Sequence, residues 1–416
     1  MRCTAPLGSF ISFITLSLAF SSLPGVLTAQ GYPTTGDSTA EATRARTAET
    51  ARRFRALAPR LVESAGIKHG DLVSISGGPA MIEEMEALGV EVQKAGGNPV
   101  LVLNSPRLTR SLYAEVDEKH LDQIPTAWET FYAKNVDVEF NLPSGEDFAT
   151  VRRVDPARRT RVDQALSRAD AATAAERNKG KTRSLFIAVP TASDTASIQM
   201  DYRQYEAMSW SAIEADYTAM AAKGQQMKQV LEGAKRLRIT SPEGTDFTVE
   251  LGGRPVFVRA GVVTPGTKGN VAARTSSLPG GSLRFAPLET TANGKIRAAE
   301  DQCDKPVRDE VVDVRNGTAV NVSAASDEEC VKRSFKGAGR FGSITIGLNP
   351  AVKFDHVPSY GPQFENGAGI VQISFGSNQN LGGANPPAPG GWSVPLLHAT
   401  VEADGKVIVK DGKLAL

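Results

Sequence analysis

The sequence has almost no excess of either sign of charge. Its 47 Lys and Arg residues stand against 46 Asp and Glu residues, which gives a formal net charge of +1. Domains that bind nucleic acids are usually clearly basic, so this balance argues against a nucleic-acid partner. Aromatic residues make up only 6% of the 416 residues, and the mean hydropathy is -0.22. These values are typical of a globular protein of two or three domains and indicate no function.

The sequence also lacks the short motifs of common cofactor and metal sites. Gly77 and Gly78 follow a predicted strand, but no GxGxxG or Walker pattern surrounds them. An ordinary turn between a strand and a helix is therefore the better interpretation. Neither Cys303 nor Cys330 has a second soft ligand at CxxC spacing, which argues against a zinc site.

The N-terminus has the pattern of a secretory signal peptide at residues 1–29. Arg2 supplies a positive charge, residues 10–20 form a short apolar run, and Ala29 precedes a polar segment. The run is short for a membrane span, although a retained anchor helix is an alternative. We expect cleavage after Ala29, export to the periplasm or the extracellular space, and no membrane attachment of the mature chain. Residues 30–40 are expected to form a disordered linker.

Cleavage would leave two cysteines, because Cys3 is removed with the signal peptide. Cys303 and Cys330 form an even pair in an oxidising compartment, which predicts one disulfide bond. On the chain-entropy model this bond stabilises the fold by roughly 3–4 kcal/mol. Two buried free thiols are the alternative.

Alternating strand and helix patterns predict an α/β domain with a largely parallel sheet at residues 41–200. Apolar residues from Met81 to Ala95 recur at helical spacing, and the flanking apolar runs predict strands. The predicted strands occupy residues 71–76, 100–103, 136–140 and 185–189. A bridging helix is expected over residues 201–235.

The remaining residues, 236–416, predict a β-rich α+β domain. Residues 236–241 and 247–251 alternate apolar and polar side chains on either side of a Pro- and Gly-containing turn, which predicts an antiparallel hairpin. Near the C-terminus, Asp-Gly turns at 404–405 and 411–412 flank a Val-rich run and predict another small hairpin.

Four stretches of this second domain share their order and spacing with one known family. They read LPGGSLRFAP at 278–287, GSITIGLNP at 342–350, GIVQISFG at 369–376 and His-Ala-Thr at 398–400. In spacing and flanking residues they resemble the thermophilic metallo-aminopeptidase family, the M29 type. The resemblance extends from about Leu57 to Leu414. It implies a metal-site domain at the C-terminal end, a peptide substrate and a homodimer.

The resemblance also implies a set of metal-ligand positions. Family members bind two divalent metals through two Glu, two His, a Tyr and an Asp. The corresponding residues here are Ser282, Ser343, Gln372, Gln379, His398 and Thr400, so His398 alone keeps its ligand type. Ser, Thr and Gln are neutral and weak oxygen donors, whereas two cations need several anionic ligands. We therefore expect a degenerate two-metal site without a metal cofactor.

The replaced positions leave several interpretations open. Gln372 and Gln379 each offer a donor and an acceptor, which suits a peptide or other small ligand, or mutual hydrogen bonds in a filled cavity. Asp355, His356 and His398 are candidates for a rearranged site that binds Zn, Co or Mn. The leading interpretation is a ligand-binding pseudoenzyme. The alternatives are an active metal-dependent aminopeptidase with rearranged ligands and a structural envelope protein.

Overall fold

A computed structural model describes most of the chain from residue 40 onward. The described residues are 40–143 except 125, several positions between 154 and 169, 182–191, 200–261, 274–354 except 304, 357, 364–386, 388 and 391–416. The predicted signal peptide and nearly all of the predicted linker lie outside them, as do Asp355 and His356. The chain divides into two compact units, with the boundary between Glu176 and Arg177.

The first unit contains the predicted strand–helix–strand motif. Strands β1 (Leu72–Gly77) and β2 (Asn98–Leu103) are parallel and are joined by helix α2 (Ile82–Lys94). Strand β3 (Val138–Asn141) pairs with β1 in parallel on its other side. The other elements are α1 (Ala40–Ser64), η2 (Pro79–Met81), α3 (Pro106–Glu115), η3 (Glu118–His120) and α4 (Thr126–Asn135). The α/β prediction for this part of the chain is confirmed.

The second unit begins with one more parallel strand pair. Strand β4 (Arg183–Ile187) pairs in parallel with β8 (Thr275–Leu278), and both lie in the second unit, whereas the sequence analysis places β4 within residues 41–200. The bridging helix predicted over 201–235 is two helices, α8 (Tyr202–Ile213) and α9 (Tyr217–Gly233). The break arises because the carboxylate of Asp216 accepts a hydrogen bond from the Ala219 amide at 3.0 Å and so caps α9.

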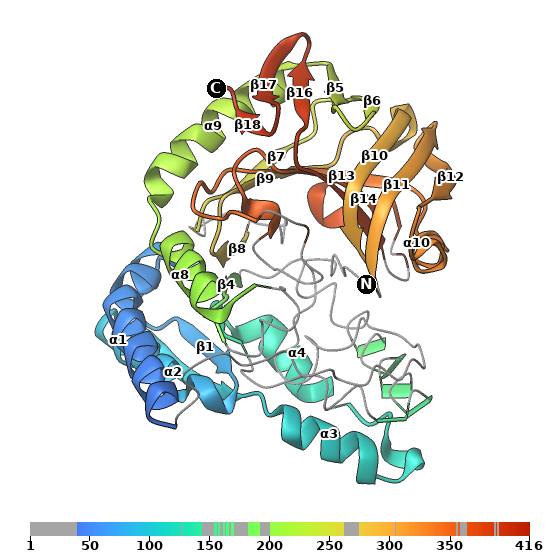
Figure 1. Cartoon of the computed structure of the whole chain (residues 1–416). Helices are drawn as coiled ribbons and strands as arrows, with labels where there is room; N and C mark the ends of the chain where they lie inside the picture. Colours follow the sequence, from blue (N-terminus) through green and yellow to red (C-terminus); the bar gives the residue numbers. More distant parts are fainter. Residues whose placement is uncertain are drawn as a thin grey trace. The chain divides into compact units, whose positions relative to one another are not determined.

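Most of the second unit is formed by two antiparallel sheets (Figure 1). The larger sheet has the order β12 (Thr318–Ser323), β11 (Pro306–Arg315), β10 (Asn293–Gln302), β6 (Asp246–Glu250), β5 (Arg236–Thr240), β16 (Thr400–Ala403), β17 (Lys406–Lys410) and β18 (Lys413–Leu414). The smaller has the order β15 (Gly391–Leu396), β14 (Val371–Gly376), β13 (Phe341–Gly347), β9 (Ser282–Phe285) and β7 (Val256–Arg259). Both predicted hairpins are present, as β5–β6 and β16–β17.

One hydrophobic core joins the two sheets. The larger sheet contributes side chains such as Ile239, Phe247 and Val312, and the smaller contributes Ile344 and Ile373 to the same cluster. Helix α10 (Glu328–Phe335) adds Val331 and Phe335. Three short helices lie in the connections of this unit: η6 (Glu289–Thr291), η7 (Phe364–Asn366) and η8 (Gln379–Leu381). Among the described helices, none is long and apolar enough to cross a bilayer.

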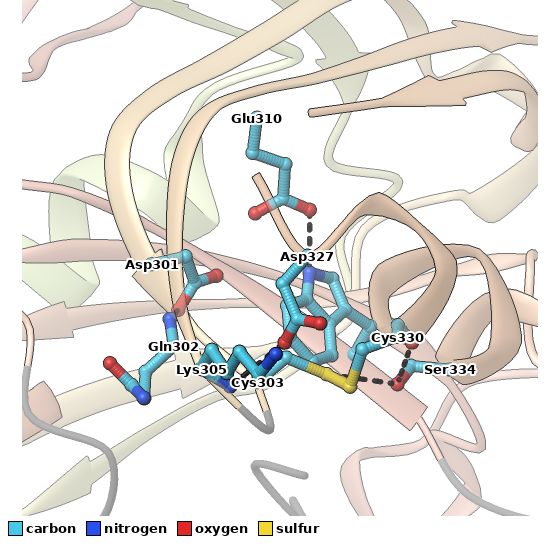
Figure 2. The surroundings of a disulfide bond; sticks show 9 residues. Asp301, Gln302, Cys303, Lys305, Glu310, Asp327, Cys330 and Ser334 are labelled. Carbon is cyan, nitrogen blue, oxygen red and sulfur yellow. Dashed lines mark hydrogen bonds between the residues drawn. A yellow bond between two sulfur atoms is a disulfide. The ribbon is translucent and has the colours of Figure 1, made fainter. Parts of the chain in front are cut away.

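The predicted disulfide bond between Cys303 and Cys330 is confirmed (Figure 2). It ties the end of β10 to α10, and the two Cα atoms lie 6.1 Å apart, which suits a disulfide. Both cysteines are buried at the edge of the core. Asp327, just before α10, accepts a hydrogen bond from the Lys305 amide at 2.8 Å, so polar contacts support the same connection.

We predict that removing this bond, by Cys303→Ser with Cys330→Ser or by reduction, lowers the free energy of unfolding by about 3 kcal/mol. The bond closes a loop of 27 positions and so restricts the unfolded chain. Denaturant unfolding of the oxidised and reduced protein measures the difference. The double variant serves as a control, because a reductant should not change its midpoint. Equal stability of the oxidised and reduced wild type would contradict the prediction.

Candidate functional site

The smaller sheet has one apolar face and one polar face. Side chains alternate between the two faces of a strand, so Leu283, Ile344 and Ile373 point into the core while their neighbours point away. The outward residues, most of which are buried, form the second face of the sheet, which we call the polar face. It comprises Phe257 and Arg259 on β7, Ser282 and Arg284 on β9, Ser343 and Thr345 on β13, Gln372 and Ser374 on β14, and Ser393 and Pro395 on β15.

Three predicted ligand positions lie on this polar face. Ser282 is opposite Arg259 on one side and Gly347 on the other. Gln372 is opposite Thr345. Ser343 lies in the next row along the sheet, opposite Ser374. Strand pairing therefore brings Ser282, Ser343 and Gln372 onto one face of three neighbouring strands, where Ser282 and Gln372 are buried.

A tight turn before β9 fixes the position of Ser282. The side-chain amide of Asn349 donates hydrogen bonds to the carbonyls of Gly280 at 2.8 Å and Ala212 at 3.1 Å. The amide of Asn366 donates to the Pro279 carbonyl at 2.9 Å. Gly281 has a φ of +112°, and a Cβ atom there would lie 2.9 Å from the Cβ of Asn349. The glycines of the LPGGS stretch and the Asn-Pro dipeptide therefore meet at this turn.

A buried carboxylate fixes the loop that carries Gln379. Oε1 of Glu289 accepts hydrogen bonds from the side chains of Arg254 at 2.8 Å and Asn378 at 2.7 Å, and from the Ala384 amide at 2.7 Å. Asn378 also donates to the Gly342 carbonyl at 2.7 Å, next to Ser343. The loop after β14 is thus attached to the start of β13, and Gln379 begins η8 with an exposed side chain.

The pKa of Glu289 reflects these contacts. Burial, the largest contribution, favours the neutral carboxyl group, but it is outweighed by the hydrogen bonds from Arg254, Ala384 and Asn378. Together they lower the pKa to about 2. Glu289 is therefore ionised and has a structural role, and its Oε1 already accepts three hydrogen bonds.

His398 and Thr400 have partners outside the polar face. Nδ1 of His398, whose side chain is 61% exposed, lies 2.7 Å from Oε1 of Glu243 in the β5–β6 turn. Thr400 is the first residue of β16 in the larger sheet. Its hydroxyl accepts a hydrogen bond from the Asp411 amide at 3.1 Å. The structure therefore places these two predicted positions beside turns of the larger sheet.

Four of the replaced positions have side-chain polar groups without hydrogen bonds in the described part of the chain, whereas Thr400 is bonded to Asp411. There, the side chains of Ser282, Ser343, Gln372 and Gln379 make no hydrogen bonds, and Gln372 and Gln379 do not bond to each other. The described residues therefore do not show the alternative in which the side-chain amides of Gln372 and Gln379 are hydrogen-bonded to each other. Ser374 and Ser393, by contrast, are paired through their hydroxyls at 2.8 Å.

Sequence reasoning missed two arginines on the polar face. Arg259 is buried, and Arg284 is partly buried with its Nη2 donating to Oε1 of Glu365 at 2.6 Å. Burial and, after it, the charge of Arg284 lower the pKa of Arg259, while Glu365 opposes this shift. Arg284 stands two residues after Ser282, so the period-two alternation of a strand would have placed both on one face.

Among the described residues, one carboxylate and two cysteine sulfur atoms lie close enough together to be considered as a metal site. Ligand atoms of Cys303, Asp327 and Cys330 all lie within 4.8 Å of one another. The two sulfur atoms form the disulfide, so this group is a cross-link and offers no thiolate pair to a metal. Asp355 and His356, the candidates for a rearranged site, lie outside the described residues.

We predict that Glu289→Gln destabilises the protein by about 2–3 kcal/mol near neutral pH. The folded-state pKa of about 2 lies below the ordinary value of 4.5, so this stabilisation is present above 4.5 and is lost as the pH falls toward 2. Denaturant unfolding over this pH range measures it. Glu300→Gln, an exposed change on β10, is the control. A wild-type advantage over Glu289→Gln that stayed constant down to the folded-state pKa would contradict the assignment.

Comparisons with known proteins identify relatives of this chain. The family model described as thermophilic metalloprotease (M29) matches residues 52–361. Wild-type AmpT from Thermus thermophilus has a similar fold, with a TM-score of 0.71, 18% identity, and coverage of 88% of this chain and 99% of its own. No curated protein matches the chain.

A second solved structure has a different named activity. The 2,5-dihydroxypyridine dioxygenase from Pseudomonas putida KT2440 matches with a TM-score of 0.56 and 14% identity, covering 89% of this chain and 97% of its own. At such identities the two structures show the fold alone, and the activity has to be argued from the site. The family model, however, covers most of the chain, and it shows that this protein belongs to the M29 family of thermophilic metalloproteases.

Proposed function

We propose that this protein is an exported, peptide-binding member of the M29 family whose two-metal site is degenerate. The observation that carries the proposal is the chemistry of the polar face. Ser282, Ser343 and Gln372 occupy predicted ligand positions there and offer only neutral oxygen and nitrogen atoms. The charged neighbours on the same face are Arg259 and Arg284, which repel cations.

A pair of divalent metals does not fit these residues. Two cations would need several carboxylate or imidazole ligands, as in other two-metal hydrolases. Among the predicted positions only His398 has such a group, and its Nδ1 is 2.7 Å from Glu243. Arg259 has two buried nitrogens, Nε and Nη2, without a hydrogen-bond partner among the described residues, which makes the local field positive. We therefore assign no step to a bound metal.

Peptide binding is supported by the family and by the unused polar groups. Membership in a metalloprotease family points to a peptide as ligand. The side chains of Ser282, Ser343, Gln372 and Gln379 are free, among described residues, to bond to peptide N–H and C=O groups. The same observation disfavours a structural envelope protein, in which the replaced positions should satisfy one another. The homodimer expected from the resemblance stays a prediction.

The active aminopeptidase with a rearranged ligand set is the second candidate. It predicts stoichiometric metal and hydrolysis of aminoacyl substrates that falls on Asp355→Ala or His398→Ala. Our proposal predicts that the purified mature protein, exchanged into buffer with trace zinc, cobalt and manganese, keeps no stoichiometric metal by mass spectrometry. It also predicts no aminopeptidase activity above that of His398→Ala. Two ions per chain, or activity abolished by chelation, would overturn the degenerate site.

Export can be checked separately from the chemistry. We predict that expression of the full chain in a secreting host yields a mature protein that begins at Gln30, because the signal pattern ends at Ala29. Intact-mass measurement of the secreted or periplasmic fraction gives the cleavage site. Deletion of residues 10–20 is the control and should leave the protein in the cytoplasm. Retention of residues 1–29 on an otherwise folded protein would support the anchor-helix alternative.

A further inference from the structure

Two arginines lie side by side on the polar face, at its β7–β9 end. Arg259 is opposite Ser282, and Phe257 is opposite Arg284, so the two arginines are diagonal neighbours on adjacent antiparallel strands. Such neighbours are close enough for long side chains to meet. The charge of Arg284 acts directly on Arg259, which is consistent with this proximity.

The positive charge of this pair is only partly balanced. Glu365 accepts one hydrogen bond, from Nη2 of Arg284 at 2.6 Å. Nε of Arg284 is buried without a hydrogen-bond partner among the described residues. Arg259 is 4% exposed, and its buried Nε and Nη2 likewise have no partner in the part of the chain that the structure describes. Within the described ranges, two guanidinium groups therefore share one carboxylate.

This excess of buried positive charge lowers the stability of the folded protein when no ligand is bound. A guanidinium group stays protonated in proteins, so the charge of Arg259 cannot be removed by losing a proton. A buried charge without a partner is strongly destabilising, because it has lost its hydration and no ion pair or hydrogen bond replaces it. A bound anion would supply the missing partner and the missing hydrogen bonds.

The chemistry of the pair selects the kind of anion. The planar fork of an arginine matches the two oxygens of a carboxylate or a phosphate, and a bidentate contact uses Nε together with one Nη atom. As far as the chain is described, Nε and Nη2 of Arg259 have no hydrogen-bond partner, so both can take part in such a contact. Hydroxyl and amide groups of Ser282, Thr345 and Gln372 share this face and can bond to the rest of the ligand.

We propose that Arg259 and Arg284 form a binding site for an oxyanionic group, a carboxylate or a phosphate, on the polar face. This inference rests on the proposed function, since it names the ligand chemistry of the same face. In a peptide ligand the group is a carboxylate at the C-terminus or on an acidic side chain. A free inorganic anion is the other source of the same chemistry.

The test measures anion binding to the full mature protein. Thermal unfolding and calorimetric titration are run with inorganic phosphate, acetate, a short peptide with a free C-terminal carboxylate and its C-terminal amide, all at constant ionic strength. We expect phosphate and the free peptide to raise the melting temperature and the amide to bind at least tenfold more weakly. A response to phosphate with no difference between the two peptides would assign the site to a free anion.

Variants separate the arginine pair from general salt effects. Arg259→Met should weaken anion binding at least tenfold, and without an anion it should unfold at the same or a higher temperature than the wild type, because it removes an unpaired buried charge. Arg259→Lys keeps the charge but loses the fork, and it should bind more weakly than the wild type. Arg297→Met removes an exposed arginine paired with Asp309 on the larger sheet, and it should respond as the wild type does.

The outcomes distinguish this inference from the proposed function. Absence of any anion response in a metal-free protein would overturn the arginine site and leave the degenerate metal site standing. Stoichiometric metal together with no anion response would overturn both. Anion binding that survives Arg259→Met unchanged would also overturn the assignment to this pair.

Discussion

The packing of the two antiparallel sheets through a single core determines everything else in the second unit. Each fully buried side chain such as Ile344 or Ile373 contributes about 1.5–3 kcal/mol when it leaves water. Because side chains alternate strictly along a strand, a shift of one residue would expose all of them at once. The core therefore fixes the register of β7, β9, β13 and β14, and the register in turn fixes which residues form the polar face.

Hydrogen bonds fix the loops that the hydrophobic core does not hold in place. The polar face ends in loops, and loops have no core to hold them. Here three buried groups take that role: Asn349 and Asn366 hold the turn before Ser282, and Glu289 holds the loop of Gln379 through Asn378. Each makes at least one hydrogen bond to a backbone group of these loops, which helps to satisfy the polar atoms of the buried backbone. The site is thus built on rigid strands and closed by side-chain contacts, an arrangement that suits binding with little reorganisation.

Much of the fold could be predicted from local patterns, because hydrophobic periodicity and turn residues act over short distances. The strand–helix–strand motif, both hairpins and the disulfide were predictable in this way. The break between α8 and α9 was not, because it depends on the single cap of Asp216 within a continuous amphipathic pattern. The partners of His398 and Arg284 could not be predicted either. Glu243 and Glu365 are distant in sequence, and only the tertiary fold brings them near.

The position of Arg259 opposite Ser282 has a consequence for any redesign of the polar face. If a carboxylate were introduced at position 282 by a single substitution, it would lie beside a buried guanidinium group and would form an ion pair with it. The charge of the new side chain would then be neutralised, and the carboxylate would add little to the binding of a cation. A design that introduces a metal ligand at position 282 would therefore have to change Arg259 before or together with Ser282. The effects of the two substitutions on cation binding would not be additive, because the two side chains are neighbours.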